Sequence, residues 1–330
     1  MNYPFISIII PVKNEEMVIE KCLQSLKQLD YPINKFEVII VDGLSADKTV
    51  EIAKNYKAKV ITNHLQTVSP GRNLGFLETK GELIAFSDAD CVMDKNWLKN
   101  SLQYFQDKNV GGVGGPNFIP KNGSAFNQAV DLLLNLGSIL SNSVHVVNLK
   151  TVKPVQSLPG CNAIYRKEAL KKVMPIDEGL LTCEDAEMNY RLSQKGYKLL
   201  YTPDVFVWHH RRDYPKKFWK QIYRYAIGRL QLSKKYPRTI NLTHFLFGLS
   251  IPIFIGLILI TILFNFSYLL IALGLIVASI TVILLGLSWA RYKSILVGLD
   301  ALLVMLIFTL AWSLGFLREL FLPIKNVKGK

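Results

Sequence analysis

Cysteine is scarce in this chain of 330 residues, and the few cysteines are widely spaced. They form no CxxC pair and no spacing typical of a metal site; the four are Cys22, Cys91, Cys161 and Cys183. This pattern argues against a zinc-binding motif and favours free thiols in a reducing cytoplasm. We expect no signal peptide, because the apolar run 6–12 is too short and no basic run precedes it.

Charged residues are nearly absent from the last quarter of the chain. Between residues 244 and 322 the only His, Lys, Arg, Asp and Glu side chains are His244, Arg291, Lys293, Asp300, Arg318 and Glu319. The stretch contains runs of about 20 residues, the length that a bilayer requires, at 244–264, 268–289 and 295–317. The sequence therefore predicts about three transmembrane helices after a soluble domain, with an uncharged turn at 265–267.

Acidic residues are outnumbered, since 25 Asp and Glu face 39 Lys and Arg, and the net charge is +14. Much of the excess lies in 209–238, directly before the apolar region. Such a basic segment favours contact with anionic lipid on the cytoplasmic side and argues against nucleic acid as a partner. We therefore expect a multi-pass protein of the cell membrane whose soluble domain is cytoplasmic.

The positive charges at the end of the chain conflict with three spans. A third full span would leave Lys325, Lys328 and Lys330 outside, against the rule that positive charge stays inside. Either the tail is exported or the last apolar segment does not cross cleanly.

Short apolar runs and helical patterns alternate along the first 90 residues. Strands are predicted at 6–11, 36–42, 58–62 and 82–87, and helices at 18–26, 47–56 and 72–79. This alternation predicts an α/β domain with a mostly parallel sheet and helices on both faces. Ligands of such sheets bind beyond the carboxyl ends of the strands, where Asp42 and Asp88 fall.

The apolar segment 125–140 is a further helix candidate. Asp131 and Asn135 interrupt it, and it is too short to cross a bilayer comfortably. It belongs either to a protein core or to the membrane surface, and we prefer the core.

Two carboxylates lie one residue apart in Asp88-Ala-Asp90, at the end of an apolar run. Both can point at one divalent cation, and Mg²⁺ typically combines few carboxylates with phosphate oxygens of a substrate. The alternative is a turn with two solvated acids.

Four ordered motifs give these acids a context. They are Pro11-Val-Lys-Asn14-Glu15, Val41–Thr49 beginning Val-Asp42-Gly43, Gly71-Arg72-Asn-Leu-Gly75, and Asp88-Ala-Asp90. Together they resemble the donor motifs of glycosyltransferase family 2, which implies a GT-A fold, a nucleotide-diphosphate sugar (UDP- or GDP-linked) and a divalent metal, Mg²⁺ or Mn²⁺.

The resemblance also implies roles on the donor side. The loop of Pro11, Asn14 and Glu15 would hold the ribose and base, Asp42 would contact the base or ribose, and Arg72 the nucleotide. Asp88 and Asp90 would bind the sugar diphosphate and the metal. The second motif departs from many relatives, which carry another acid where this chain has Gly43.

The second half of the domain resembles the acceptor side of the same family. Gly160, Cys161 and Asn162 resemble the glycine-rich segment that floors the acceptor site. Glu184 and Asp185 resemble the acidic pair whose second member, Asp185, is the catalytic base. Acids at a helix start are also favoured by the helix dipole, and the two interpretations are compatible.

A histidine after the last strand of the domain completes the metal site in several relatives, and here His209 takes that place. Two carboxylates and a neutral imidazole are a reasonable divalent-metal set. Alternatively, His209 and His210 join Arg211 and Arg212 in a basic cluster that faces lipid headgroups.

Gln221-Ile-Tyr-Arg224-Tyr225 resembles the Gln-x-x-Arg-Trp motif of membrane polysaccharide synthases, with tyrosine in place of tryptophan. The resemblance places Arg224 at the donor diphosphate, and Gln221 and Tyr225 on the acceptor side. The alternative is an ordinary interfacial helix over 214–236. Its apolar face, surrounded by cations, would then lie in the membrane interface; that face comprises Phe218, Trp219, Ile222, Ala226 and Leu230.

The sequence thus predicts a GT-A domain at 1–210, an interfacial segment at 211–242 and a membrane anchor at 243–330. The expected reaction is inverting transfer of a sugar to a membrane-held, lipid-linked acceptor of the polyprenyl-phosphate type. A phosphate acceptor would need the base less than a hydroxyl would. One alternative is a processive polysaccharide synthase, although no span precedes the domain. Another is a non-catalytic sugar-binding or scaffold protein, which the intact acids Asp88, Asp90 and Asp185 oppose.

Overall fold

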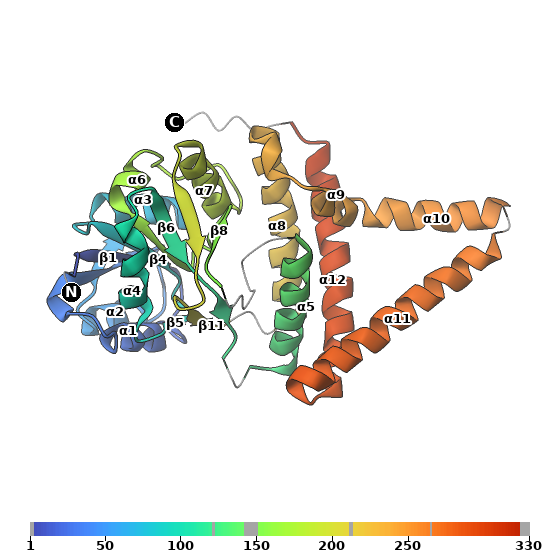
Figure 1. Ribbon diagram of the computed structural model, residues 1–330, viewed down its shortest axis with the longest axis horizontal. Coiled ribbons are helices and arrows are strands. Elements are labelled where there is room, and N and C mark those ends of the chain that lie inside the picture. The colour runs from blue at the N-terminus through green and yellow to red at the C-terminus, as the bar shows by residue number, and fades with distance from the viewer. Residues whose placement is uncertain (1–2, 121–122, 142–150, 211–213, 265, 324–330) are drawn as a thin grey trace. The chain divides into compact units, whose positions relative to one another are not determined.

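The computed structural model describes residues 3–120, 123–141, 151–210, 214–264 and 266–323 (Figure 1). The chain forms two compact units, each built from several stretches. The first unit comprises 1–120, 138–178 and 184–211, and the second comprises 121–137, 179–183 and 212–330. The second unit thus includes two stretches that precede residue 210.

A mixed eight-stranded sheet is the centre of the first unit, in the order β3-β2-β1-β4-β9-β6-β10-β8. Its strands are β1 (Ile6–Val12), β2 (Phe36–Asp42), β3 (Lys59–Thr62), β4 (Leu83–Ser87), β6 (Val110–Gly114), β8 (Lys153–Val155), β9 (Asn162–Arg166) and β10 (Lys198–Tyr201). The half formed by β3, β2, β1 and β4 is parallel, whereas β9 runs antiparallel to both β4 and β6. The predicted α/β fold is confirmed.

Helices cover both faces of this sheet. They are α1 (Ile19–Lys27), α2 (Thr49–Asn55), α3 (Val68–Leu77), α4 (Trp97–Ser101), α6 (Lys167–Lys171) and α7 (Glu184–Gln194). Ile8 and Ile10 of β1 belong to the same buried cluster as α1, while Ile9 belongs to another with Leu74 of α3. Alternate side chains of a strand point to opposite faces, so β1 is buried on both sides.

A small second sheet places β11, the last strand of the first unit, beside the segment that follows Asp88 and Asp90. It has the order β5-β11-β7, with β5 (Cys91–Met93), β7 (Asn117–Phe118) and β11 (Val207–His209). Its antiparallel register pairs His209 with Cys91, the residue next to Asp90.

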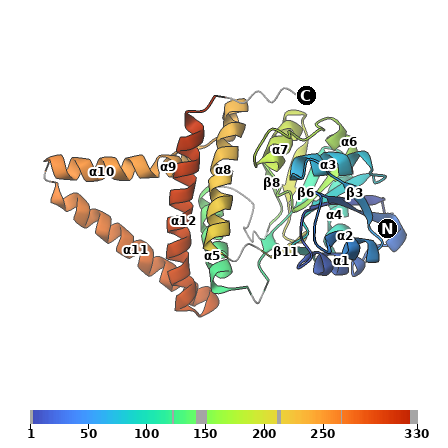
Figure 2. The same ribbon diagram turned by 180° about the vertical axis from the view of Figure 1, so that it is seen from behind.

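The second unit is helical. It comprises α5 (Ala125–Ser141) up to residue 137, α8 (Pro215–Lys235), α9 (Leu242–Gly248), α10 (Ser250–Phe264), α11 (Ser267–Tyr292) and α12 (Ile295–Leu320). The two ribbon views show α8 and α12 side by side, with α10 and α11 meeting at a tip away from α8 (Figures 1 and 2). The apolar core between the helices includes Phe126 and Val130 of α5, so the preferred interpretation of 125–140 as a core helix agrees with its packing.

The apolar face of α8 is not free to enter a membrane. Phe218, Ile222, Ala226 and Leu230 are all buried in a cluster with α12 side chains, and only Trp219 of the predicted face stays half-buried. The expectation that this face lies in lipid is therefore corrected. Periodicity identified an apolar face, but another helix covers it, so any lipid contact of α8 must use its other side chains.

Two helices of the described chain, α11 and α12, are long and apolar enough to cross a membrane. The pair of α9 and α10 counts as a third span only if it acts as one unit, and it is bent by 59°. The prediction of about three spans therefore becomes two, or up to three.

Candidate active site

Two loops at the carboxyl ends of β1 and β2 are fastened to each other. Asn14 has a left-handed backbone (φ 55°), its N–H donates to Ser45 Oγ at 2.9 Å, and its Oδ1 accepts from the Ala46 N–H at 2.8 Å. The Glu15 N–H donates to Thr49 Oγ1 at 2.8 Å. These bonds hold the first and second predicted donor motifs together as one rim.

Asp42 ends β2 on the same rim. Both of its carboxylate oxygens accept from the Ser45 N–H at 3.2 Å, which fixes the side chain. Gly71, at the start of the third motif, packs on Pro11: a Cβ there would lie 3.2 Å from the Pro11 Cβ. The structure therefore gathers Pro11, Asp42 and the third motif at one edge of the parallel half-sheet.

Arg72 of α3 connects residues far apart in the chain. Its guanidinium is buried and makes ion pairs with Glu184 (Nη1 to Oε1, 3.1 Å) and Asp88 (Nη2 to Oδ1, 3.4 Å). It also donates to the Gly160 carbonyl oxygen at 3.1 Å. Any side chain at residue 160 would collide with it, because a Cβ would lie 2.5 Å from Nη1. Burial, followed by the charge of Asp185, raises the pKa of Glu184 against the opposing effect of Arg72.

Asp185 lies in the first turn of α7 and is held on both oxygens. Oδ2 accepts from the Gly160 N–H at 3.0 Å and Oδ1 from the Ala186 N–H at 2.7 Å. Cys183, with φ 67°, makes the left-handed turn that leads into the helix. The glycine-rich segment and the acidic pair, predicted separately, therefore meet.

Asp88, Asp90 and His209 form a compact set of ligands. One ligand atom of each lies within 4.8 Å of the others, and all three side chains are half-buried. His209 Nε2 lies 3.2 Å from Asp90 Oδ2. Two carboxylates and an imidazole are suitable donors for Mg²⁺ or Mn²⁺, so these residues fit the predicted cation.

The charges of this set depend on burial. Burial is the largest cause that raises the pKa of Asp88 to about 7, while Arg72 opposes the shift. Burial alone would lower the pKa of His209, but the Asp90 carboxylate outweighs it and raises the pKa well above its ordinary value. A divalent cation would stabilise both carboxylates in their charged form.

A set of softer ligands shares His209. The sulfurs of Cys91 and Cys161 and a ring nitrogen of His209 all lie within 4.8 Å of one another. Asn117 Nδ2 donates to the Cys161 sulfur at 3.1 Å. Sequence spacing gave no sign of this set, because the sheet brings together residues that are distant in the chain.

Asn162 was expected on the acceptor side, but its side chain has no exposed surface. Its Oδ1 accepts from Trp97 Nε1 at 2.8 Å, and its Nδ2 donates to the carbonyl oxygens of Pro116 and Val205. Cys161 is buried as well. Of the three residues of this motif, Gly160 is the one whose backbone contacts Arg72 and Asp185.

Gln221, Arg224 and Tyr225 belong to α8 in the second unit. Gln221 Nε2 donates to the Tyr225 hydroxyl at 3.1 Å, and the Tyr225 side chain is exposed. The Arg224 carbonyl oxygen accepts from Thr182 Oγ1 at 3.0 Å.

Sequence reasoning missed Thr182 and its neighbour Gly228. A Cβ on Gly228 would lie 2.2 Å from Thr182 Oγ1, so glycine allows the close approach of α8 to the segment 179–183. A glycine inside a long predicted helix is the signal that could have indicated this contact.

The first unit resembles known glycosyltransferases. The family model described as "Glycosyl transferase family 2" matches residues 7–174. The chain is 30% identical over 237 residues to Glycosyltransferase AglE of Haloferax volcanii. This match covers 69% of this chain and 74% of that protein. The chain is 31% identical over 248 residues to a dolichyl N-acetyl-alpha-D-glucosaminyl phosphate 3-beta-D-2,3-diacetamido-2,3-dideoxy-beta-D-glucuronosyltransferase of Methanococcus voltae, covering 70% and 75%.

A solved structure extends the likeness to the whole fold. The mannosyltransferase PcManGT of Pyrobaculum calidifontis, in complex with GDP-Man and Mn²⁺, superposes with a TM-score of 0.68 at 17% identity, over 97% of this chain and 88% of that one. It confirms the predicted GT-A fold. With the family model and the two relatives, the conclusion is that this chain is a glycosyltransferase and belongs to glycosyltransferase family 2.

Proposed function

We propose that this enzyme transfers a sugar, with inversion, from a nucleotide diphosphate to a lipid-linked acceptor on the cytoplasmic face of a membrane. The observation that carries the proposal is the network around Arg72 and Gly160. It joins Asp88, expected at the donor, to Glu184 and Asp185, expected at the acceptor. Donor and acceptor chemistry would thus share one preorganised set of groups.

The donor would bind along the rim of Pro11, Asn14, Glu15 and Asp42, whose loops are held together by backbone-to-side-chain hydrogen bonds. Asp88, Asp90 and His209 would hold Mg²⁺ or Mn²⁺. A bound cation would neutralise charge that develops on the leaving diphosphate. The Pyrobaculum neighbour, crystallised with GDP-Man and Mn²⁺, supports a nucleotide sugar and this class of metal.

Asp185 would take the proton of an acceptor hydroxyl as the oxygen attacks the anomeric carbon. Its two hydrogen bonds fix the carboxylate, and a single displacement inverts the anomeric centre. Glu184 stays paired with Arg72 and so would position its neighbour rather than accept the proton. With a phosphate acceptor, which is already an anion, Asp185 would orient the acceptor instead.

The membrane-held acceptor is supported by the apolar helices of the second unit and by the dolichyl phosphate in the name of the Methanococcus relative. Arg224 would add a fork of donors for the diphosphate, as the Gln-x-x-Arg pattern implies. Gln221 and Tyr225 would bind the acceptor, with Tyr225 in the place of the usual tryptophan.

The test is a panel of UDP- and GDP-sugars incubated with the full-length enzyme, Mg²⁺ or Mn²⁺, and a polyprenyl-phosphate lipid. Released nucleotide and the lipid product are measured together. We expect one donor class to react and one sugar to be added to each lipid. Long glycan chains would indicate a processive synthase instead, and no turnover of any donor would contradict the proposed enzyme.

A further inference from the structure

Helices α8 and α12 of the second unit lie side by side and run in the same direction (Figures 1 and 2). Near the middle of α8, the Tyr223 carbonyl oxygen approaches Gly315 so closely that a Cβ there would lie 2.4 Å from it. At the end of α8, Lys234 Nζ donates to the Leu322 carbonyl oxygen at 2.6 Å and pairs with Glu319. Both helices therefore must have similar orientations to a membrane.

Helix α8 cannot cross a bilayer, because it carries charge along its whole length. Its cations are Lys216, Lys217, Lys220, Arg224, Arg229, Lys234 and Lys235. Each Lys or Arg at the centre of a span costs roughly 2.5–3.5 kcal/mol on the insertion scale. The composition of α12 alone permits a span, but its packing on α8 does not.

The exposed side of α12 suits a helix that lies along the membrane surface. In its most apolar stretch, 39% of the residues are buried in the protein, against 6% in α11. Five of its exposed leucines follow one helical stripe: Leu296, Leu299, Leu303, Leu306 and Leu314. Their spacing of three, four or eight residues keeps them on one face, which can meet lipid while the opposite face holds α8.

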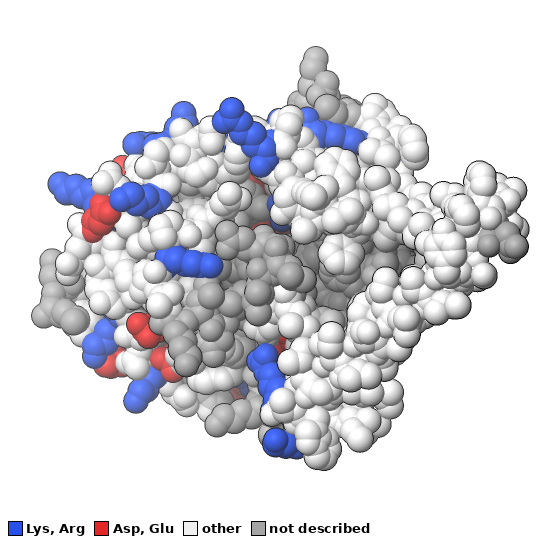
Figure 3. Space-filling model, turned by 45° about the vertical axis from the view of Figure 1, so that its right-hand side comes forward, with Lys and Arg blue, Asp and Glu red and all other residues white. Residues whose placement is uncertain are grey.

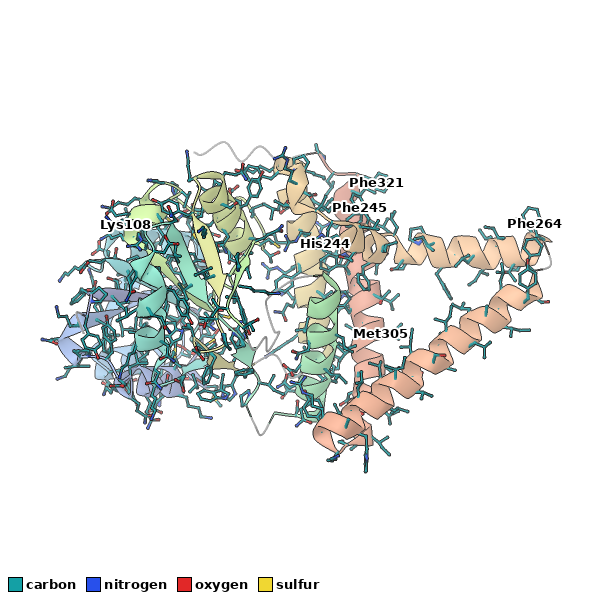
Figure 4. The ribbon with its side chains drawn as sticks, in the orientation of Figure 1. Lys108, His244, Phe245, Phe264, Met305 and Phe321 are labelled. Carbon is teal, nitrogen blue, oxygen red and sulfur yellow. The ribbon has the colours of Figure 1, made fainter. Side chains whose placement is uncertain are left out.

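Helices α10 and α11 form an arm that is the most apolar part of the described chain. No Lys, Arg, Asp or Glu occurs from residue 250 to 290, and Figure 3 shows no blue or red atoms on the arm except at its foot, where α11 ends. Phe264 lies at the tip of the arm and 63% of it is exposed (Figure 4).

Helix α10, one of the two helices of the arm, is too short to reach across a bilayer from α12. Helix α9 is fastened to α12, since Ser313 Oγ donates to the Gly248 carbonyl oxygen at 2.9 Å and the His244 ring stacks on Trp312. Only α10 extends from there. Its 15 residues give a length of about 22 Å, less than a hydrocarbon core of ~30 Å.

We propose that α12 is not a membrane span. It lies in the membrane surface beneath α8, and only the α10–α11 arm enters the hydrocarbon, as a re-entrant hairpin that does not cross. The lipid chains of one leaflet would cover this arm and the leucine stripe of α12. The end of α12 then stays on the side of the catalytic unit, and the conflict between three spans and the positive-inside rule disappears.

Labelling of single introduced cysteines tests this topology in sealed vesicles with the full-length enzyme. Lys108→Cys marks the catalytic side, Phe321→Cys the end of α12 and Phe264→Cys the tip of the arm, and all three positions are exposed. Labelling of the wild type, whose Cys22, Cys91 and Cys161 are buried, is subtracted.

With an impermeant maleimide, we expect Phe321→Cys and Lys108→Cys to react from the same side. Phe264→Cys should react from neither side and only after detergent is added. Reaction of Phe321→Cys from the side opposite Lys108→Cys would overturn the proposal for α12. Reaction of Phe264→Cys from that opposite side would overturn the proposed depth of the arm.

A separate observation, the thiol pair beside His209, carries a second inference. Cys91 and Cys161 are both buried, and register pairs Cys91 directly with His209. Two sulfurs and one imidazole nitrogen within 4.8 Å are the donors that Zn²⁺ and Cd²⁺ prefer, unlike the carboxylates of Asp88 and Asp90. The Asn117 bond to the Cys161 sulfur would orient that ligand.

We infer that a soft divalent cation binds Cys91, Cys161 and His209 and removes His209 from the carboxylate set. Zn²⁺ or Cd²⁺ would then inhibit the enzyme in competition with Mg²⁺ or Mn²⁺. The inhibition rests on the proposed role of His209, whereas the binding does not. A direct measurement of binding therefore distinguishes failure of this site from failure of the proposed function.

Cd²⁺ is titrated into full-length enzyme freed of metal, and the ultraviolet charge-transfer band of cadmium thiolate is followed. We expect saturation at one equivalent, loss of the band in Cys91→Ala and retention in Cys22→Ala, a buried cysteine outside the set. An equal band in Cys91→Ala would overturn the site. In the nucleotide-release assay with Mn²⁺, added Zn²⁺ should inhibit the wild type and Cys22→Ala much more than Cys91→Ala. Equal inhibition of all three would overturn the competition.

Discussion

The backbone N–H of Gly160 donates a 3.0 Å hydrogen bond to Asp185 Oδ2, across 25 residues of sequence. The carbonyl oxygen of the same glycine accepts from Arg72 at 3.1 Å. The backbone of Gly160 thus orients both Asp185, the proposed base, and the buried Arg72 guanidinium that pairs with Glu184. Because a Cβ at residue 160 would collide with Arg72, the geometry depends on glycine.

We predict that Asp185→Asn lowers kcat by about 10²–10⁴-fold, the usual contribution of a general base. Asparagine keeps an oxygen that can accept from the Gly160 N–H, so the segment should hold its shape. Donor affinity should therefore change little. Steady-state kinetics and equilibrium binding of the nucleotide sugar measure the two effects separately.

The matched control is Asp30→Asn, which removes an exposed carboxylate paired with Lys99. Surface pairs of this kind contribute little, so its kcat should stay near the wild-type value. Near-normal turnover in Asp185→Asn would remove Asp185 as the base and leave a phosphate anion as the consistent acceptor.

Asp90→Ala should weaken nucleotide-sugar binding in Mn²⁺ by at least about tenfold, because it removes a ligand that also holds His209. In excess EDTA the variant and the wild type should bind alike. Calorimetric titration under both conditions measures the difference, with Glu78→Ala, an exposed acid, as control. Full wild-type activity in EDTA would contradict the metal role of Asp88, Asp90 and His209 together.

Thr182→Val should lower kcat roughly tenfold with little change in donor affinity. The hydroxyl bonded to the Arg224 carbonyl anchors the segment that leads directly into Glu184 and Asp185, and small displacements of catalytic groups are costly. Thr182→Ser, which keeps the hydroxyl, should restore the rate, and Gly228→Ala should impair it by steric contact with Thr182. A purely structural role for Thr182 would give a different result. In that case Thr182→Ser and Thr182→Val would lose the same fraction of kcat, in proportion to the fall of the thermal midpoint.

Arg224→Ala should reduce kcat/KM for the donor, and Arg224→Lys should recover only part of it, because lysine lacks the planar fork that suits a diphosphate. Arg229→Ala removes a cation from the same helix and is the matched control. It should leave kcat/KM nearly unchanged. Equal losses in both alanine variants would mean that Arg224 contributes only to the general positive charge of α8.

Asp131→Ala should destabilise the second unit. The buried Asp131 carboxylate accepts from Arg291 Nη2 at 2.8 Å and from the Tyr292 hydroxyl at 3.0 Å. Since 46% of the Arg291 side chain is exposed, water can replace part of the lost pairing, and we expect a loss of about 1–3 kcal/mol. The thermal midpoint in detergent should fall relative to Asp300→Ala, and an unchanged midpoint would contradict this role.

The parallel half of the sheet could be predicted because its strands are short apolar runs, and acids stand at the ends of two of them, Asp42 at β2 and Asp88 after β4. β1, β2 and β4 lie within one or two residues of their predicted ranges. The start of α3 was missed, since the helix begins at Val68 and not at Arg72. The first turn of α3 contains Pro70 and Gly71, and proline is tolerated in the first turn of a helix.

The contacts that build the site could not be predicted from one sequence. Arg72 and Glu184 are 112 residues apart and Asp90 and His209 are 119 apart, and only the folded sheets bring them together. The partner of an apolar helical face was equally hidden. The spacing of Phe218 and Ile222 is the same whether the face meets lipid or, as here, another helix.

The proposed reaction moves a sugar from a nucleotide diphosphate to a membrane lipid. The most direct test follows a radiolabelled sugar from its UDP or GDP donor into the organic phase of a reaction containing polyprenyl-phosphate lipids and Mn²⁺. We predict that the wild type transfers label to a lipid that then carries one added sugar. This product should be absent when EDTA is added and when the Asp90→Ala variant replaces the wild type. Label that stays in the aqueous phase with every donor, or enters only a water-soluble polymer, would contradict transfer to a lipid.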